Sequence, residues 1–224
     1  TRTVIVWSSI ANVGKAFQES WNKLNIPTLL WFSSITKGVS LLPKLDCHDS
    51  VEYGCPASDN EVNDMSFYNY KVINRSTLPL NDTYFGQWVD ADLGYYLDDY
   101  VGCDVGLGLG FCYNGDAEDE GAAGYGFNPP AIGVDFFQGP IADQGDGIDN
   151  DRDGVIDEAG EQIIMSKFVY YNNDFTVTGN PEGGTDIYNY LRGIWKDNIP
   201  MTFGGDGHGG GNGATTDLAN YMFP

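Results

Sequence analysis

Alternating acidic residues between positions 149 and 158 have the spacing of a calcium-binding loop. Aspartates at loop positions 1, 3, 5 and 9 surround a glycine at position 6, where the backbone must turn sharply, and position 7 offers a carbonyl oxygen. Calcium is a hard cation that takes about six to eight oxygen ligands, and alternating carboxylates can wrap around it. The sequence therefore predicts a Ca²⁺ site with the ligands Asp149, Asp151, Asp153, Val155, Asp157 and Glu158.

The end of this loop departs from the usual pattern. A bidentate Glu ordinarily closes a calcium loop at position 12, but Gly160 stands there. Glu158, Glu161 or a more distant carboxylate would replace it, and this departure argues against a helix-loop-helix sensor. Asp143 and Asp146 continue the acidic run upstream, where they would widen the site or hold a second ion. The alternative interpretation is a solvated acidic loop without a metal.

A second acidic cluster, with Asp90, Asp92, Asp98 and Asp99, follows an aromatic strand candidate. It has three interpretations: another cation site that stabilises a loop, a carboxylate pair for glycoside hydrolysis, or a polar loop with local hydrogen bonds. In glycoside hydrolysis one carboxyl group protonates the leaving oxygen while the other attacks or activates water. Because neighbouring aspartates are common in an acidic chain, spacing alone does not establish catalysis, and we predict that this cluster is structural.

Other chemistries have less support. The histidines are His48 and His208, and the chain lacks the Gly-x-Ser-x-Gly turn of serine hydrolases. Cys47, His48 and Cys55 lack an evident fourth zinc ligand. Aromatic residues near the second cluster could stack on sugar rings, although such residues more often belong to a core. They are Tyr84, Trp88, Tyr95 and Tyr96. We therefore expect a protein without enzymatic activity.

The charge balance restricts the partners. The chain of 224 residues has 32 acidic and 11 basic residues and a net charge of −21. This self-repulsion destabilises a compact state unless cations offset it, and it opposes binding to nucleic acid, which needs clustered Lys and Arg. No apolar run approaches the ~20 residues of a membrane span. The expected partners are calcium and polysaccharide or other cell-surface components, with no nucleic acid and no membrane span.

Four cysteines fall into two close pairs. Cys103 and Cys112 flank a glycine-rich stretch that could turn a hairpin and bring the two sulfurs together. Two disulfides in an oxidising compartment are one interpretation, and four reduced, buried thiols are the other. Of these we predict the disulfides, Cys47–Cys55 and Cys103–Cys112.

The N-terminal part of the chain mixes helical and loop patterns. Apolar residues at helical spacing between positions 13 and 24 predict an amphipathic helix, and a short apolar strand follows at 28–32. Residues 46–64 are expected to form a loop. We expect residues 1–59 to be an N-terminal segment of helix plus loop, separate from a β-rich calcium-binding domain at 60–224.

The remaining residues are rich in strand patterns. Alternation at 65–73 and 83–89 predicts the two strands of a hairpin. Further strands are expected at 132–137, 166–171 and 175–178, a long loop at 102–130 in which 110–113 could pair, and a flexible glycine-rich tail at 204–213. Thr185 is expected to cap a helix whose apolar face consists of Ile187, Tyr190, Leu191, Ile194 and Trp195. The pattern predicts a mainly β fold, an antiparallel β-sandwich-like domain with long Asp/Gly-rich loops and one or two added helices.

Residues 60–224 contain several distinctive blocks, which are NDMSFYNYKVINRS at 63–76, GQWVDADLG at 86–94, DDYVGCD at 98–104, CYNGD at 112–116, PPAIGVDFFQGP at 129–140 and YNYLRGIWK at 188–196. These blocks resemble large secreted proteins of Bacteroidota that use type IX secretion. The resemblance implies export to the cell surface or the medium, and a longer protein that continues beyond Pro224. It supplies no activity and no catalytic residues.

Together these patterns predict an extracellular, calcium-stabilised structural or adhesion module of a larger secreted or cell-surface protein. The alternatives are a secreted polysaccharide hydrolase that uses carboxylates such as Asp90 and Asp99, or a carbohydrate-binding module that uses Trp88 and nearby tyrosines. A cleft with two facing carboxylates would favour the hydrolase, and a flat aromatic platform would favour sugar binding.

Overall fold

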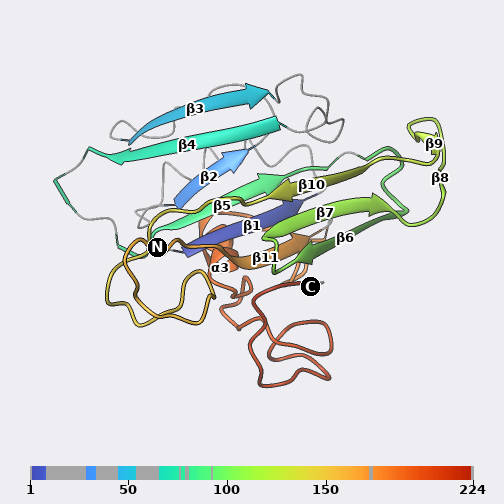
Figure 1. Ribbon diagram of the computed structural model, residues 1–224. Coiled ribbons are helices and arrows are strands. Elements are labelled where there is room, and N and C mark those ends of the chain that lie inside the picture. The colour runs from blue at the N-terminus through green and yellow to red at the C-terminus, as the bar shows by residue number, and fades with distance from the viewer. Residues whose placement is uncertain are drawn as a thin grey trace. The chain divides into compact units, whose positions relative to one another are not determined.

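The computed structural model describes residues 2–8, 29–33, 45–53, 66–75, 77–78, 81–91, 93–171 and 174–222 (Figure 1). The chain divides into two compact units, one of residues 1–35 with 81–224 and one of residues 36–80. This division differs from the expected boundary between residues 59 and 60. Strands from the first 35 residues pair with strands of the later chain, so they belong to the larger unit.

The larger unit is built around a parallel sheet of four strands. Its order is β11 (Met165–Tyr171), β1 (Arg2–Ser8), β5 (Tyr84–Val89) and β2 (Leu29–Ser33), and every neighbouring pair is parallel. In β11, five of the seven residues are apolar or aromatic, and the two exceptions are Ser166 and Lys167. Side chains of this strand enter cores on both faces of the sheet. A strand of a parallel sheet is typically covered on both faces in this way.

A smaller antiparallel sheet belongs to the same unit. Its order is β10 (Ala131–Asp135), β7 (Leu109–Asn114) and β6 (Asp99–Asp104). The turn between β6 and β7 is held by a hydrogen bond of 2.9 Å from the Leu107 N–H to Asp104 Oδ1. A short ladder of β8 (Glu118–Asp119) and β9 (Gly126–Phe127) follows β7 along the chain.

Two hydrophobic clusters hold these elements together. The first joins α3 (Gly184–Leu191) to the parallel sheet, and its buried members are Tyr84, Val169, Tyr171, Ile187, Tyr190, Leu191, Trp195 and Met201. The second lies between strands of the parallel and antiparallel sheets, with Val89, Leu93, Cys103, Cys112, Met165 and Phe168. Along β11, Phe168 belongs to the second cluster and Val169 to the first, as the alternation of a strand requires.

The smaller unit contains an antiparallel hairpin of β3 (Leu45–Tyr53) and β4 (Ser66–Asn74). The expectation of a loop at 46–64 is therefore wrong for residues 46–53. The expected hairpin of residues 65–73 with 83–89 is wrong as well, because β4 pairs with β3 whereas β5 pairs with β1 and β2. β4 thus forms a local hairpin with the strand before it, whereas β5 pairs with strands that are distant in the sequence.

The mainly β prediction is confirmed, with one helix, α3, in the described part of the chain. Antiparallel pairing holds for the smaller sheets, but the four-stranded sheet is parallel, and the sandwich stays a prediction. The long loop expected at 102–130 contains most of a β hairpin. Residues 175–178 form a turn and no strand. The helix expected at 13–24 lies outside the described residues. None of the described helices is long and apolar enough to cross a membrane.

The start of α3 also differs from the expectation. Its N-cap is Gly183, and no side chain caps the helix, so Thr185 lies inside the first turn. The glycine-rich segment after α3 is tied to the core by side-chain contacts. The Trp195 Nε1–H donates to the Gly207 carbonyl at 2.8 Å, and His208 Nε2 lies 2.8 Å from Asp197 Oδ2. These bonds explain how a segment with little apolar surface follows a defined path.

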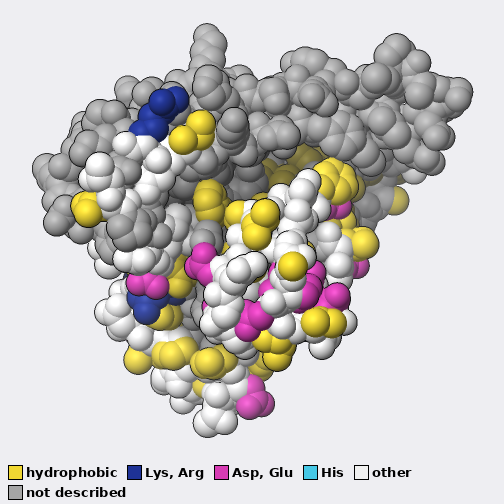
Figure 2. Space-filling model, turned by 60° about the vertical axis from the view of Figure 1, so that its left-hand side comes forward, with side chains coloured by type: hydrophobic (Ala, Val, Ile, Leu, Met, Phe, Trp, Pro, Cys, Tyr) yellow, Lys and Arg dark blue, Asp and Glu magenta, His cyan; other side chains and the backbone are white. Residues whose placement is uncertain are grey.

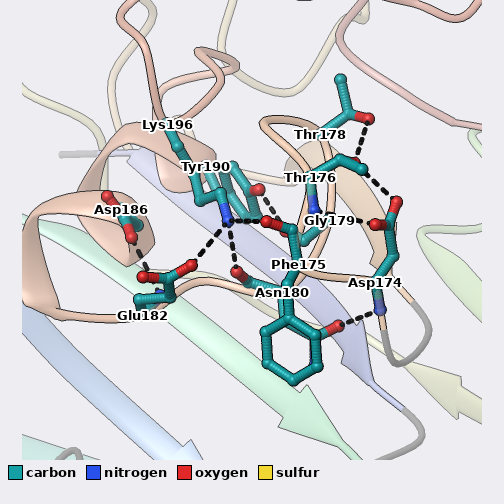
Figure 3. A network of polar contacts seen from close by, with 10 residues as sticks. All are labelled: Asp174, Phe175, Thr176, Thr178, Gly179, Asn180, Glu182, Asp186, Tyr190 and Lys196. Atoms are coloured by element: carbon teal, nitrogen blue, oxygen red, sulfur yellow. Dashed lines mark hydrogen bonds and ion pairs between the residues drawn. The ribbon is translucent and has the colours of Figure 1, made fainter.

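A lysine fixes the turn that leads into α3 (Figure 3). Lys196 Nζ donates to the carbonyls of Phe175 and Asn180 at 3.4 and 3.0 Å and lies 3.3 Å from Glu182 Oε1. Only 12% of the Lys196 side chain is exposed. Asp174 closes the same turn by accepting hydrogen bonds from the N–H and hydroxyl of Thr176 at 2.8 and 2.7 Å.

Lys196→Met is expected to lower the free energy of unfolding by about 1.5–3 kcal/mol, because two carbonyls lose a charged donor in a nearly buried position. Urea unfolding of the parent and the variant measures this difference. Arg192→Met is the control, since it removes the same charge from an exposed guanidinium that lies over the Tyr188 ring. It is expected to cost about 0.5–1 kcal/mol. Equal effects of the two substitutions would contradict a bracing role for Lys196.

Cys103 and Cys112 are free, buried thiols, contrary to the predicted disulfide. In the ladder of β6 and β7, Cys103 lies opposite Gly110 and Cys112 lies opposite Val101, so the two cysteines are diagonal neighbours. Diagonal neighbours have Cα atoms about 7–8 Å apart, beyond the usual span of a disulfide. Burial, chiefly, raises the pKa of Cys103 to about 11 and that of Cys112 to about 12. Of the other predicted disulfide, Cys55 lies outside the described residues.

Both thiols are therefore expected to resist alkylation in the folded protein and to react fully after unfolding, because burial blocks the reagent and a raised pKa suppresses the thiolate. Peptide mapping after iodoacetamide treatment, with and without urea, checks each cysteine separately. A disulfide-linked peptide that contains Cys103 and Cys112 would show that the register does not prevent the bond.

Candidate metal centre

The acidic loop lies in the connection between β10 and β11 and is anchored to the core by an arginine. Arg152 donates from its guanidinium to the carbonyls of Met165 and Val105, each at 3.0 Å, and to the Tyr221 hydroxyl. The Ile164 N–H also donates to the Asn150 carbonyl at 3.3 Å. These bonds hold both sides of Asp151 against the two sheets, so the carboxylates of the loop start from a fixed backbone.

Three of the predicted ligands come together at the start of this loop. Asp149, Asp151 and Asp153 each place a carboxylate oxygen within 4.8 Å of the others. Each also accepts a backbone hydrogen bond inside the loop, from Gly154 N–H at 3.0 Å, from Asp153 N–H at 3.2 Å and from Val155 N–H at 2.8 Å respectively. The loop thus uses some carboxylate oxygens to fix its backbone and leaves others for a ligand.

Glycine is needed at the turn of the loop. Gly154 has φ +97°, in a region that side chains of L residues rarely adopt. Its N–H points to Asp149, which brings the first carboxylate back over the loop. The position 6 glycine predicted from the sequence therefore has the conformation that such a loop requires.

A second group of carboxylates shares Asp151 with the first. Asp151, Glu158 and Glu161 also place oxygens within 4.8 Å of one another. Glu161 is buried, with 4% of its surface exposed, and accepts a hydrogen bond from the Asn150 N–H. Among the described residues, buried Asp149 Oδ1 and Glu158 Oε2 have no hydrogen-bond partner. Buried oxygens without a donor are costly, and a cation would satisfy them.

The raised pKa of Glu158 also favours a bound cation. A hydrogen bond from its own backbone lowers the pKa of Glu158, but loss of hydration and the charges of Glu161, Asp151 and Asp153 raise it overall. A raised carboxyl pKa means that the negative charge is disfavoured where it stands. A divalent cation among these groups would remove that penalty.

Asp157 does not join either group of carboxylates. Its Oδ1 accepts from the Gly145 N–H at 2.8 Å, and its Oδ2 accepts from the Gly147 N–H at 3.2 Å. Asp157 therefore closes the upstream glycine-rich turn, which the sequence pattern did not indicate. Glu161, which the sequence offered as a substitute for the missing final ligand, lies in the cluster. The Val155 side chain is exposed, as expected of a residue that would contribute only its carbonyl.

The donor set suits calcium. The two groups contain carboxylates only, and oxygen-rich sets of this kind bind calcium or magnesium in preference to softer metals. Exposed acids such as Asp143 and Asp146 flank them. Figure 2 shows Asp and Glu side chains (magenta) gathered on the face of the molecule turned toward the viewer. Asp151, which belongs to both groups, is the residue on which an ion would centre.

The second acidic cluster is placed around the start of β6. Asp90 is buried with 7% exposed, and burial, then the charges of Asp98 and Asp119, raise the pKa of Asp99 to about 6. Asp92 lies outside the described residues. Of the aromatic residues named from the sequence, Tyr84 is buried in the first core and Trp88 packs against it. The core interpretation therefore holds for these two, whereas Tyr96 is exposed.

An aromatic row that the sequence did not single out lies on the antiparallel sheet. The rings of Tyr100 and Tyr113 and those of Phe111 and Tyr113 have centroids 6.0 Å apart in each pair. Tyr100 is 59% and Tyr113 44% exposed. Alternation along β6 and β7 would have predicted this row once the two strands were paired.

Comparisons of the chain with protein-family models, with curated proteins and with solved structures find no match, so a function for this chain has to be argued from the acidic loop and its surroundings.

Proposed function

We propose that this protein is an extracellular module whose fold is stabilised by calcium bound in the loop of residues 149–161, and that it serves a structural or adhesive role in a larger secreted or cell-surface protein. The observation that carries the proposal is the meeting of two carboxylate groups at Asp151. Buried oxygens of Asp149 and Glu158 without hydrogen-bond partners among the described residues support it.

Charge supports the same proposal. The chain has a net charge of −21, and a compact state with that charge repels itself unless cations offset it. Extracellular calcium modules bind with dissociation constants of about 10⁻⁴–10⁻³ M, which suits calcium outside the cell. The resemblance of residues 60–224 to secreted Bacteroidota proteins is the reason to propose export. Calcium would then link the carboxylates and fix the conformation of the loop after secretion.

Limited proteolysis tests this proposal. With calcium, the segment from 143 to 161 is expected to resist cleavage, whereas in chelator it is expected to be cut first, because repulsion among its carboxylates opens the loop. Mass spectrometry locates the cuts. Magnesium should protect less, since it demands a tighter octahedral shell and sheds water reluctantly. The same cutting pattern with calcium as with chelator would contradict a calcium-set loop.

A carbohydrate-binding module is the second candidate, favoured by the row of exposed Tyr100 and Tyr113 with half-buried Phe111. Exposed aromatic faces at fixed spacing are a suitable surface for sugar rings. Affinity electrophoresis on a panel of polysaccharides tests it, with Tyr100→Ala and Tyr113→Ala beside the parent. Retardation that both variants lose would favour sugar binding, and no retardation on any polysaccharide would count against it. The burial of Asp90 speaks against a hydrolase that uses this carboxylate on a polymer.

A further inference from the structure

A second group of polar side chains lies where β6 begins and β7 ends. In the antiparallel ladder Asp99 lies directly opposite Asn114, so their side chains share one face of the sheet. Cys112 and Cys103 on that face are buried in the second core, which shows that it is the inner face. Asp98 precedes β6, and its carbonyl accepts the Gly115 N–H at 2.8 Å, which closes this end of the hairpin.

Several polar atoms of these side chains are buried without the partners that such atoms need. Asn114 is 7% exposed, and neither atom of its amide has a hydrogen-bond partner among the described residues. Both carboxylate oxygens of Asp98 and Oδ1 of Asp99 also lack a hydrogen-bond partner by geometry. The Glu120 carboxyl lies close enough to Asp98 for a shared hydrogen bond to raise the pKa of Glu120. Buried polar atoms of native proteins are paired in the great majority of cases, and each unpaired one costs about 1–3 kcal/mol. Four of these five atoms are oxygens, which a cation would satisfy, and the fifth is the Asn114 amide nitrogen, which needs an acceptor.

The groups that act on Asp98 and Asp99 are themselves acidic. Asp119 is 2% exposed, but its carboxylate is already used, accepting the N–H groups of Tyr95 and Tyr125 at 2.8 Å each. The charges recorded nearest Asp99 are those of Asp98 and Asp119, which are both negative. A ligand at this place would therefore have to carry positive charge or hydrogen-bond donors. It would also have to contact several oxygens at once.

We propose that Asp98, Asp99 and the amide oxygen of Asn114 hold a second divalent cation of the calcium class. Carboxylate and amide oxygens are the ligands that calcium prefers, and Asn114 lies opposite Asp99 in the ladder, on the same face of the sheet. Three side chains supply fewer oxygens than the roughly six to eight that calcium takes, so backbone carbonyls or water must complete the shell. This site does not rest on the loop of residues 149–161.

The site would fasten the open end of the hairpin. Asp98 lies before β6 and Asn114 ends β7, so an ion between them would join the two strands beyond their last pair. The same ion would neutralise Asp98 and Asp99 at the edge of the second core. Asp99, which the sequence offered together with Asp90 for a hydrolase, is thereby assigned to binding a metal.

Equilibrium dialysis with calcium as the probe tests this site, because it measures the number of calcium ions bound per chain. Four proteins are compared, each first treated with chelator: the parent, Asp98→Asn with Asp99→Asn, Asp151→Ala with Asp153→Ala, and Glu118→Gln. Glu118 is exposed in β8 and serves as the charge control. The parent is expected to bind about two ions, each double variant about one, and the control as many as the parent. The two sites thus succeed or fail separately.

Thermal melts distinguish a variant that has lost the binding site from one that does not fold. In chelator, Asp98→Asn with Asp99→Asn is expected to melt above the parent, because two buried charges are gone, and its gain from calcium is expected to be smaller. Asn114→Ala keeps both charges and should weaken binding at this site about tenfold or more. Binding by the Asp98/Asp99 and Asn114 variants that equals the parent's would overturn the proposal. The proposal would also be overturned if the Asp98/Asp99 variant melts below the parent in chelator and its melting temperature rises with calcium as much as the parent's does.

Discussion

Calcium is expected to raise the unfolding midpoint of this protein by about 5–10 °C over the midpoint in chelator. A ligand that binds only the folded state adds about 2.7 kcal/mol of stability at one hundred times its dissociation constant. For a chain of 224 residues, each kcal/mol shifts the midpoint by about 2–4 °C. The physical cause is the repulsion among Asp149, Asp151, Asp153 and Glu158, which an ion removes. Thermal melts in chelator, calcium and magnesium measure the shift, and magnesium should give the smaller one.

Substitution of Asp151 and Asp153 by alanine is expected to remove most of this response. Asp151 belongs to both carboxylate groups, so its loss dismantles each of them. Any response that remains would belong to the site proposed at β6 and β7. Glu118→Ala with Asp217→Ala removes the same charge from exposed positions and should leave the response intact. If the two pairs of substitutions reduce the calcium shift equally, the effect is one of net charge and the loop is not a site.

Glu161→Gln is expected to weaken calcium binding at the loop by about tenfold to a hundredfold, whereas Asp157→Asn should change it by about twofold or less. Glu161 lies with Asp151 and Glu158 in one carboxylate group. Asp157 is instead engaged by the N–H groups of Gly145 and Gly147. A lost charged ligand costs about 1.4–2.8 kcal/mol for such a change in affinity. Isothermal titration calorimetry of the chelator-treated variants measures both constants.

The two substitutions remove the same charge four residues apart, so each is the control for the other. Asp157→Asn should lower the stability of the protein without calcium, because it weakens the acceptor of the upstream glycine turn. A loss of affinity in Asp157→Asn that matches the loss in Glu161→Gln would place the ion on Asp157, as the sequence pattern first suggested.

Local sequence patterns predicted the parts of the fold that depend on residues close together in the sequence. The alternation at residues 66–73 and the apolar run at 166–171 are strands, and the apolar spacing from 187 to 191 lies on a helix. The turn glycine Gly154 and the carboxylates at positions 149, 151 and 153 lie together as their spacing indicated. These features depend on neighbours within a few residues, so the sequence carries them directly.

Pairing between distant segments could not be predicted in the same way. β1 pairs with β11 and β5, although about 80 or more residues separate them, and no short pattern encodes such a register. The diagonal placement of Cys103 and Cys112 follows from the register of β6 and β7, and a shift by two residues would have put them opposite each other. Asn114 was missed for the same reason, since only the ladder places it beside Asp99.

The sequence predicted most of the carboxylates of the site. It did not predict the hydrogen bonds that form within the loop. Spacing identified the first three carboxylates and the glycine, and it offered Glu161 as a substitute for the missing final ligand. It could not show that Asp157 turns toward Gly145 and Gly147, because that choice depends on the conformation of the upstream turn. Competition between backbone donors and a cation for one carboxylate is decided by geometry and not by residue type.

The most direct test is a crystal structure of the protein grown with calcium, with anomalous scattering used to locate the ion. A peak is expected in the loop, with oxygens of Asp149, Asp151 and Asp153 about 2.3–2.6 Å away and Glu158 or Glu161 completing the shell. A loop of residues 149–161 that holds only water in crystals saturated with calcium would contradict it.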